Sequence, residues 1–268
     1  MLANPSTTHA QSYRWAYRLV YGLLLIIFFL PLYTEKPYLP QEQGQVINAL
    51  LQVTPAEPYR ALAPFFHLAT IALMALMVWR PERAGRLVAA YMGLNYLVIG
   101  WVQGQGLTVD YGYVVHTGNV VACVLLAMIW LRVAWQNQLN ITLSQLNWRH
   151  YALAPLALLA FWSPAAVTAS GVMPDFNPML LLTSPAYGLT YCLTTPVFLF
   201  WLIIALPNVP SLAYRITAFN GLLYGLINQA AWFDPAGWWM GFLHLPLLGL
   251  SIIALWLARR QLPVTREG

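Results

Sequence analysis

Charged residues are scarce in this chain: Asp, Glu, Lys and Arg together make up 8% of its 268 residues, whereas 60% of the residues are hydrophobic. A water-soluble domain usually carries about 25% charged residues. So few charges would leave large apolar surfaces facing water, and such surfaces aggregate. The composition therefore argues against a protein surrounded by water and predicts one embedded in a lipid bilayer.

Lysine and cysteine are nearly absent as well. Lys36 is the one lysine, and the remaining basic residues are arginines scattered between apolar runs. The net charge of +5 therefore fits membrane loops, and no nucleic-acid partner is expected. The two cysteines, Cys123 and Cys192, lie inside apolar runs without a CxxC spacing. We expect both to be small buried residues rather than parts of a disulfide framework.

Eight apolar segments approach the roughly 20 residues that a bilayer span requires. Each should be helical, because lipid offers no hydrogen-bond partner to an open backbone. The predicted fold class is therefore all-α, a polytopic membrane protein with eight transmembrane helices. The segments are residues 16–33, 63–80, 87–104, 111–132, 150–169, 187–206, 213–231 and 238–258.

The basic residues predict the orientation. With the N-terminus inside, eleven of them fall in inner segments and only two, Lys36 and Arg60, in outer segments. Positively charged loops stay on the cytoplasmic side. Because eight is even, both termini are predicted to be cytoplasmic, in a cell inner (plasma) membrane.

The two halves of the chain resemble each other at a nearly constant offset. Residues 90–96 match residues 218–224, residues 50–56 match residues 180–186, and His116 falls on His244. We therefore predict two parallel four-helix repeats, residues 1–140 and 141–268, related by a pseudo-two-fold axis along the membrane normal, as in parallel-repeat transporters. After the first helix of each repeat comes a longer outer loop with a short apolar run, expected to cap the outer face.

The repeat unit has its outer loop after the first helix and an inner turn with Arg80, Arg83 and Arg86 between the second and third helices. In this layout the unit resembles DoxX-like membrane proteins. The resemblance implies a multi-pass membrane fold and assigns no functional residue.

The sequence lacks residues that several classes of protein require. The predicted spans contain no Asp, Glu or Lys, although proton-driven transporters commonly relay protons through buried carboxylates. A retinal Schiff base is excluded because the lysine lies in a loop. No phosphate-binding glycine loop, HExxH or GxSxG motif occurs. Whether the protein is an enzyme stays open.

Histidines are the main candidate ligands. His67, His116 and His244 each lie five to seven residues from the outer end of a predicted span, which is roughly 7–10 Å of depth at 1.5 Å per residue. Three imidazoles at one depth would suit a metal or substrate site, since neutral imidazole binds copper, zinc, iron and nickel. The alternatives are axial ligation of haem b by His116 and His244, or ordinary hydrogen bonds to neighbouring carbonyls.

Amides in the outer half of the predicted bundle could support such a site. Buried amides need partners, and in lipid they join helices or line a polar cavity. The candidates for substrate binding are Asn95, Asn119, Asn228 and Gln229.

The leading hypothesis from the sequence is a membrane transporter or binding subunit for a small solute or metal ion. The alternatives are a haem b- or quinone-linked redox subunit, or a non-catalytic scaffold among the subunits of a membrane complex. The cofactor is unknown, with a transition metal or haem b as candidates.

Overall fold

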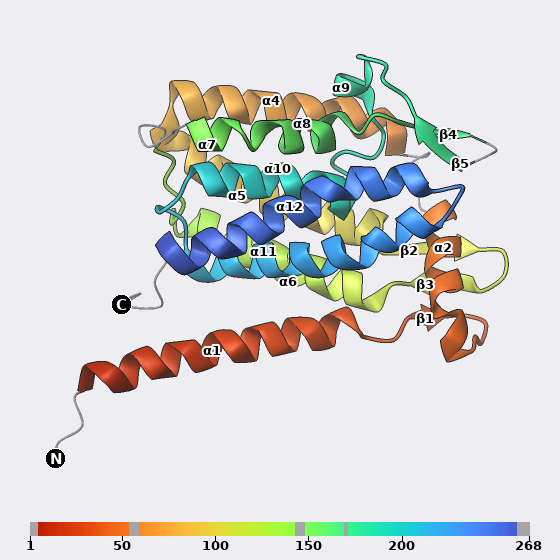
Figure 1. Ribbon diagram of the computed structural model, residues 1–268, viewed down its shortest axis with the longest axis horizontal. Coiled ribbons are helices and arrows are strands. Elements are labelled where there is room, and N and C mark those ends of the chain that lie inside the picture. The colour runs from red at the N-terminus through yellow and green to blue at the C-terminus, as the bar shows by residue number, and fades with distance from the viewer. Residues whose placement is uncertain (1–4, 54–58, 143–147, 169–170, 262–268) are drawn as a thin grey trace.

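The structure, a computed structural model, describes residues 5–53, 59–142, 148–168 and 171–261. It is 71% helical, so the predicted all-α character is confirmed at that level. A helix lies in each of the eight segments predicted to span the bilayer, and the helices run side by side along the long axis of the molecule (Figure 1). They are α1 (Pro5–Phe28), α4 (Ala63–Trp79), α5 (Pro81–Val102), α6 (Thr117–Trp135), α8 (Ala154–Trp162), α10 (Tyr191–Ile204), α11 (Ser211–Ile227) and α12 (Trp238–Gln261).

Two of the predicted spans each include four residues that form a strand instead of helix. Helix α8 ends at Trp162 because Ser163 adopts a left-handed conformation, with φ of 47°, and Pro164 follows it. Residues 165–168, which were predicted to continue this helix, form a strand instead. Helix α6 begins at Thr117 rather than near residue 111, because the residues just before it also form a strand.

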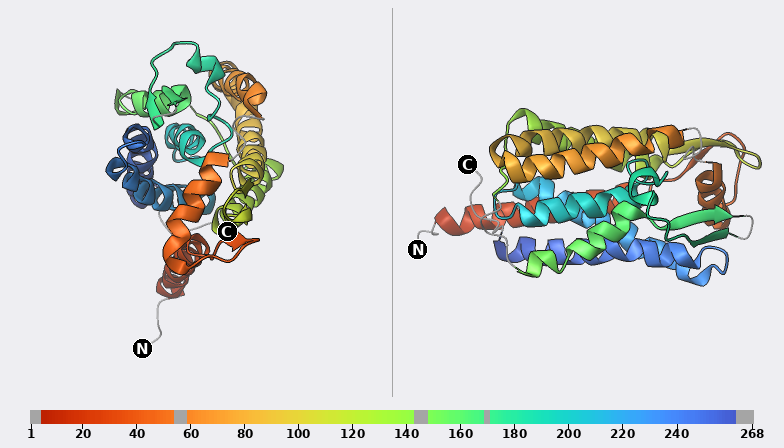
Figure 2. Two further views of the ribbon diagram at one scale, coloured as in Figure 1. Left: turned by 90° about the vertical axis from the view of Figure 1, so that its right-hand side faces the viewer. Right: turned by 90° about the horizontal axis from the view of Figure 1, so that it is seen from above.

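These strands belong to two small antiparallel sheets that the sequence analysis did not predict. One sheet has the strand order β1-β3-β2, and the other pairs β4 with β5. Both lie at one end of the bundle, together with two short helices (Figures 1 and 2). The elements at this end are β1 (Tyr33–Thr34), α2 (Gln43–Val53), β2 (Gln105–Thr108), β3 (Gly112–Val115), β4 (Ala165–Thr168), β5 (Gly171–Pro174) and α9 (Leu180–Thr183).

The turn between β2 and β3 depends on two residues. The Thr108 hydroxyl accepts a hydrogen bond from the Tyr111 backbone N–H at 3.1 Å and donates one to the Gly112 carbonyl at 3.0 Å. Gly112 has a φ of 65°, a conformation that suits glycine. Strands flanking such a turn pair with each other, so residues 105–115 form a hairpin instead of extending α6 outward.

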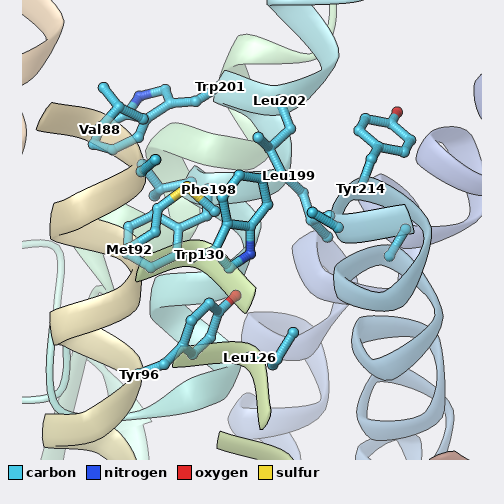
Figure 3. Close-up of a cluster of buried hydrophobic side chains, with 14 of the residues drawn as sticks. Val88, Met92, Tyr96, Leu126, Trp130, Phe198, Leu199, Trp201, Leu202 and Tyr214 are labelled. Atoms are coloured by element: carbon cyan, nitrogen blue, oxygen red, sulfur yellow. The ribbon is translucent and has the colours of Figure 1, made fainter. Parts of the chain in front are cut away.

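The core lies between the two halves of the chain. Helix α5 packs along α6 and helix α11 along α12, and side chains of α5 and α6 meet those of α10 and α11. Tyr96 and Trp130 from the first half lie beside Phe198 and Leu199 from the second (Figure 3). The Trp130 indole N–H donates to the Thr217 hydroxyl across this contact at 2.9 Å. The two predicted repeats therefore share one core, while their duplication stays a prediction.

Two helices, α6 and α12, are long and apolar enough to cross a membrane by length and composition alone. A core helix of a water-soluble protein can meet the same criterion. The distribution of exposed side chains is therefore the better guide to the surroundings of the bundle.

Candidate functional site

His67 is completely buried in α4, against elements of the second half. Its Nε2 donates to the Ser184 carbonyl at 3.3 Å, and its ring contacts those of Phe161 and Tyr187 at centroid distances of 4.6 and 4.8 Å. Its Nδ1 has no hydrogen-bond partner among the described residues, and neither has the Ser184 hydroxyl. His67 thus fastens the segment before α10 to α4.

His116 occupies the N-cap position of α6 rather than the interior of a helix. Its Nδ1 accepts a hydrogen bond from the Asn119 backbone N–H at 3.2 Å. Its own backbone N–H donates to the Gly104 carbonyl at 2.7 Å. These contacts are those of a helix cap, in which a side chain satisfies an N–H of the first turn.

His244 is the seventh residue of α12 and is nearly buried. Its ring hydrogen-bonds to the backbone of Asn228, and its Nδ1 has no partner among the described residues. His116 and His244 therefore have different partners and different places relative to their helices, although the predicted repeat pairs them in sequence.

The structure does not gather the three histidines into one metal site. Within the described ranges, no group of three or more His, Cys, Asp and Glu side chains is placed to hold a metal ion. The hydrogen bonds of the three rings go to backbone groups of their surroundings.

The predicted amides divide into two groups. Asn119 accepts a hydrogen bond from the Cys123 thiol at 3.8 Å, and Asn228 donates to the Cys192 sulfur at 2.9 Å. Gln229, in contrast, donates to the Gly225 carbonyl one turn earlier and accepts from the exposed Trp232 indole N–H. Asn119 and Asn228 thus face the interior, whereas Gln229 is engaged at the outer end.

Asn95 joins the two halves. Its side-chain N–H donates to the Gly188 carbonyl at 2.9 Å, and the Gly188 backbone N–H donates to the Thr194 hydroxyl at 2.9 Å. The Asn95 side-chain oxygen is buried without a partner among the described residues. This amide therefore holds the start of α10 against α5.

A buried polar cluster lies between α5, α6, α10 and α11. The Tyr191 ring lies 5.9 Å from the Tyr96 ring and 4.8 Å from the Tyr224 ring, centroid to centroid. Asn220 donates to the Tyr191 hydroxyl at 2.9 Å, and the Tyr191 backbone N–H donates to the Gln103 side chain at 2.8 Å. We use the name polar cluster for Tyr96, Asn119, Cys123, Tyr191, Cys192, Asn220, Tyr224 and Asn228.

The Tyr224 hydroxyl is the group of this cluster whose hydrogen-bonding capacity is unused. It is buried without a partner in the described part of the chain, and it lies within electrostatic range of both thiols. A buried hydroxyl without a partner costs free energy, so such a group is expected to find one when a ligand or water reaches it.

Of this cluster, the sequence analysis named Asn119 and Asn228 as candidates and did not name Asn220, the tyrosines or the cysteines. Both cysteines were interpreted as small apolar residues, and they are buried. The neglected signal was the combination of tyrosine with amide in α11, where Asn220 and Tyr224 are four residues apart and share a helix face.

The polar cluster consists of hydroxyl, amide and thiol groups and contains no carboxylate, lysine or arginine. It offers hydrogen-bond donors and acceptors, aromatic faces and two soft sulfur atoms. Such a lining suits a neutral polar or aromatic solute better than a strongly charged one, because nothing in the cluster would neutralise a buried charge.

Comparisons with protein-family models, with curated proteins and with solved structures found no significant match to this chain.

Proposed function

We propose that the chain is a multi-pass membrane protein with eight spanning helices, both termini cytoplasmic, that binds a small neutral solute in the polar cluster and acts as a transporter or binding subunit. The membrane part of the proposal is supported by the outward-facing side chains. Large apolar residues are exposed on most helices, and the middle of the bundle carries Leu68, Ile71 and Met74 on α4, Leu94 and Leu97 on α5, Val121, Val124 and Met128 on α6, and Leu245 and Ile252 on α12.

Exposed aromatic residues at both ends of the helices support the same conclusion. Those toward the inner side are Trp15, which lies ten residues after the start of α1, and Trp79, Trp135 and Trp256 near the ends of their helices; those at the outer ends are Phe29, Phe65, Trp101 and Trp238. On α1 and α4 the inner and outer members are separated by about 21 Å, and on α12 by about 27 Å, at 1.5 Å per residue. Aromatic belts mark the two interfaces of a hydrocarbon core about 30 Å thick.

The exposed arginines support the orientation. Those in the turn between α4 and α5 and at the ends of α6 and α12 lie at the end of the bundle opposite the two sheets (Figure 1). They are Arg80, Arg83, Arg86, Arg132, Arg259 and Arg260. The end with the arginines would face the cytoplasm, and the end with the sheets, α2 and α9 would face outward.

Cell fractionation and tagging test this part. The protein should stay with membranes after alkaline carbonate extraction, require detergent for purification, and report a cytoplasmic location for tags at both termini. A chain that is monodisperse in buffer without detergent, or tags that report opposite compartments, would refute the topology.

The binding part of the proposal rests on one observation, the unpartnered Tyr224 hydroxyl, which lies within electrostatic range of two thiols in a cluster that also holds three amides. Most buried polar groups in proteins have a hydrogen-bond partner, so an unpaired hydroxyl in this cluster is available to a ligand. A solute with a hydroxyl or carbonyl group would satisfy the Tyr224 hydroxyl and stack against the tyrosine rings.

The chain contains only the two cysteines of the cluster, so the native thiols can report access to it. Cys192 is the second residue of α10, whereas Cys123 is the seventh residue of α6, and both helices begin at the outer end. An impermeant methanethiosulfonate reagent added outside sealed cells should modify Cys192 faster than Cys123. The variants Cys123→Ser and Cys192→Ser assign the label to each position.

Two outcomes decide the binding proposal. Labelling of the folded protein from outside supports a pathway from the outer face to the cluster. If both thiols stay unmodified until the protein is denatured, including with the small permeant reagent N-ethylmaleimide, the cluster is closed packing and the solute site is rejected.

A further inference from the structure

Three helices meet at the inner end of the bundle around one buried arginine. The Arg215 Nε of α11 donates to the Ser211 hydroxyl at 3.2 Å, and its NH2 group donates to the Ala258 carbonyl of α12 at 2.7 Å. Its guanidinium lies 5.1 Å from the ring centroid of Tyr17 of α1, and the Tyr17 hydroxyl donates to Ser211 at 3.0 Å. We call these four residues the inner corner.

Exposed arginines flank the inner corner on two of its helices. Arg18 follows Tyr17 on α1, and Arg259 and Arg260 follow Ala258 on α12. The Arg260 guanidinium carbon lies 4.0 Å from the centroid of the Trp256 ring, which is itself partly exposed. This stacking holds a planar cation at the level of the inner aromatic belt.

A guanidinium group matches a phosphate better than an ammonium group does, because its planar set of donors binds two oxygens at once. Basic residues next to a cytoplasmic interface attract the anionic lipids of that leaflet, and basic sites between helices bind their head groups. Arg18, Arg259 and Arg260 follow residues of the inner corner in sequence, and the Arg260 guanidinium already stacks on Trp256. This arrangement provides that kind of site.

We propose that the arginines flanking the inner corner bind the phosphate of an anionic phospholipid from the cytoplasmic leaflet. Arg18, Arg259 and Arg260 contact the head group, and Arg215 of α11 positions α1 and α12, the two helices that carry them. The inference rests on the proposed membrane location and goes beyond the proposed solute site, which lies toward the opposite end of the bundle.

The other inner arginines provide a matched control. Arg83 is in the first turn of α5, and Arg132 lies near the end of α6, where its Nε donates to the Gln136 side chain of the same helix at 3.4 Å. Both are exposed. The double variants Arg18→Gln with Arg260→Gln and Arg83→Gln with Arg132→Gln therefore remove equal charge from the same membrane face.

The experiment uses the purified full chain in neutral detergent, titrated with phosphatidylglycerol or phosphatidylcholine, with native mass spectrometry to count bound lipid. Phosphatidylglycerol should bind in preference to phosphatidylcholine. The R18Q/R260Q variant should lose about tenfold in phosphatidylglycerol affinity, whereas R83Q/R132Q should change less than about twofold. An equal loss in both variants would show a diffuse surface charge effect and overturn the site.

Two further arms sharpen the test. Arg260→Lys keeps the charge but loses the planar stack on Trp256, so it should weaken lipid binding about threefold; unchanged affinity would overturn the assignment to Arg260. Inorganic phosphate, added at matched concentration, should not displace the lipid. Full displacement would assign the corner to a soluble anion instead of a lipid.

The experiments distinguish failure of the lipid site from failure of the membrane proposal. If the membrane proposal fails, the chain is soluble without detergent and copurifies with no lipid. If only the lipid site fails, the chain still requires detergent and the two double variants respond alike.

Discussion

On α4, two polar side chains are buried, whereas the apolar side chains next to them in the sequence are exposed. Leu68 and Ile71 are 58% and 43% exposed, whereas His67 and Thr70, one position before each of them, are completely buried. The same contrast recurs on α12, where Ser251 is buried and Ile252 is exposed. In water-soluble proteins the apolar residues are the ones most often buried. The comparison teaches that on these two helices polar side chains turn toward the interior and apolar side chains turn outward, the arrangement expected for the proposed lipid surroundings.

Among the variants considered, a charge placed on the exposed side of α4 should cause the largest loss of folded protein, and the loss should depend on its position along the helix. Ile71→Arg places a cation near the middle of α4, where insertion into the hydrocarbon core costs about 2.5–3.5 kcal/mol. We expect a strong loss of folded protein, measured by size-exclusion chromatography of a fluorescent fusion after detergent extraction.

Val78→Arg is the control on the same helix, because Val78 is also exposed (64%, against 43% for Ile71) but lies beside Trp79 and Arg80 at the inner end. It should be tolerated, since a long side chain there reaches the interface. If both variants fold equally well, water rather than lipid surrounds α4, and the proposed membrane location is wrong.

Breaking a polar pair inside the bundle should have the next largest effect. Asn220→Leu removes the donor to the Tyr191 hydroxyl and leaves that hydroxyl buried without its partner, at a cost of about 1–3 kcal/mol. The free energy of unfolding in a mild detergent, measured by denaturant titration, checks this.

Adding Tyr191→Phe to Asn220→Leu should recover part of the loss, because both partners are then apolar. A double-mutant cycle quantifies the coupling. If the losses in unfolding free energy of the two single variants simply add, the Asn220 and Tyr191 side chains do not interact, and the hydrogen bond between them does not stabilise the interior.

The cap of α6 should have a moderate effect. His116→Ala removes the acceptor for the Asn119 backbone N–H and should cost about 1 kcal/mol, whereas His116→Asn should retain most of the stability because asparagine is a good N-cap. Thermal unfolding of the two variants in one detergent gives the comparison. A much larger loss for both, accompanied by loss of a bound metal or haem absorption, would restore the ligand role predicted from the sequence.

Gln229 should have the smallest effect. Its partners are a carbonyl of its own helix and the exposed Trp232, so Gln229→Ala should change the unfolding free energy by less than about 0.5 kcal/mol. The same melting assay measures it. If Gln229→Ala instead altered thiol labelling of Cys192, that result would support the substrate-binding role predicted for Gln229 from the sequence.

The helical segments could be predicted because their signal is long and redundant: each is a run of apolar residues bounded by arginines or by glycine and proline. The ends were harder to predict. Residues 165–168 and 112–115 are as apolar as the helices beside them, and only the local conformations of Ser163 and Gly112 decide that they become strands. Periodicity over so few residues does not separate strand from helix.

The candidate site could be predicted only in part. Depth along a helix placed the amides near one level, and Asn119 and Asn228 do face the polar cluster. Depth does not give the direction in which a side chain points, so the three histidines, grouped by depth, turned out to have separate surroundings. The tyrosines escaped notice because a tyrosine in an apolar run shows its polar tip only when its neighbours are known.

Residues 184–188 act as a clasp between the halves. They follow α9 in the second half, yet the Ser184 carbonyl binds His67, the Tyr187 hydroxyl lies 2.8 Å from the Thr70 hydroxyl, and the Gly188 carbonyl binds Asn95. Gly188 itself, with φ of 81°, lies so close to Phe66 that an added Cβ would collide with its ring. Any rocking of one half against the other must therefore either break these contacts or carry α4 and α5 along with the second half, so the boundary between moving parts would not coincide with the midpoint of the chain.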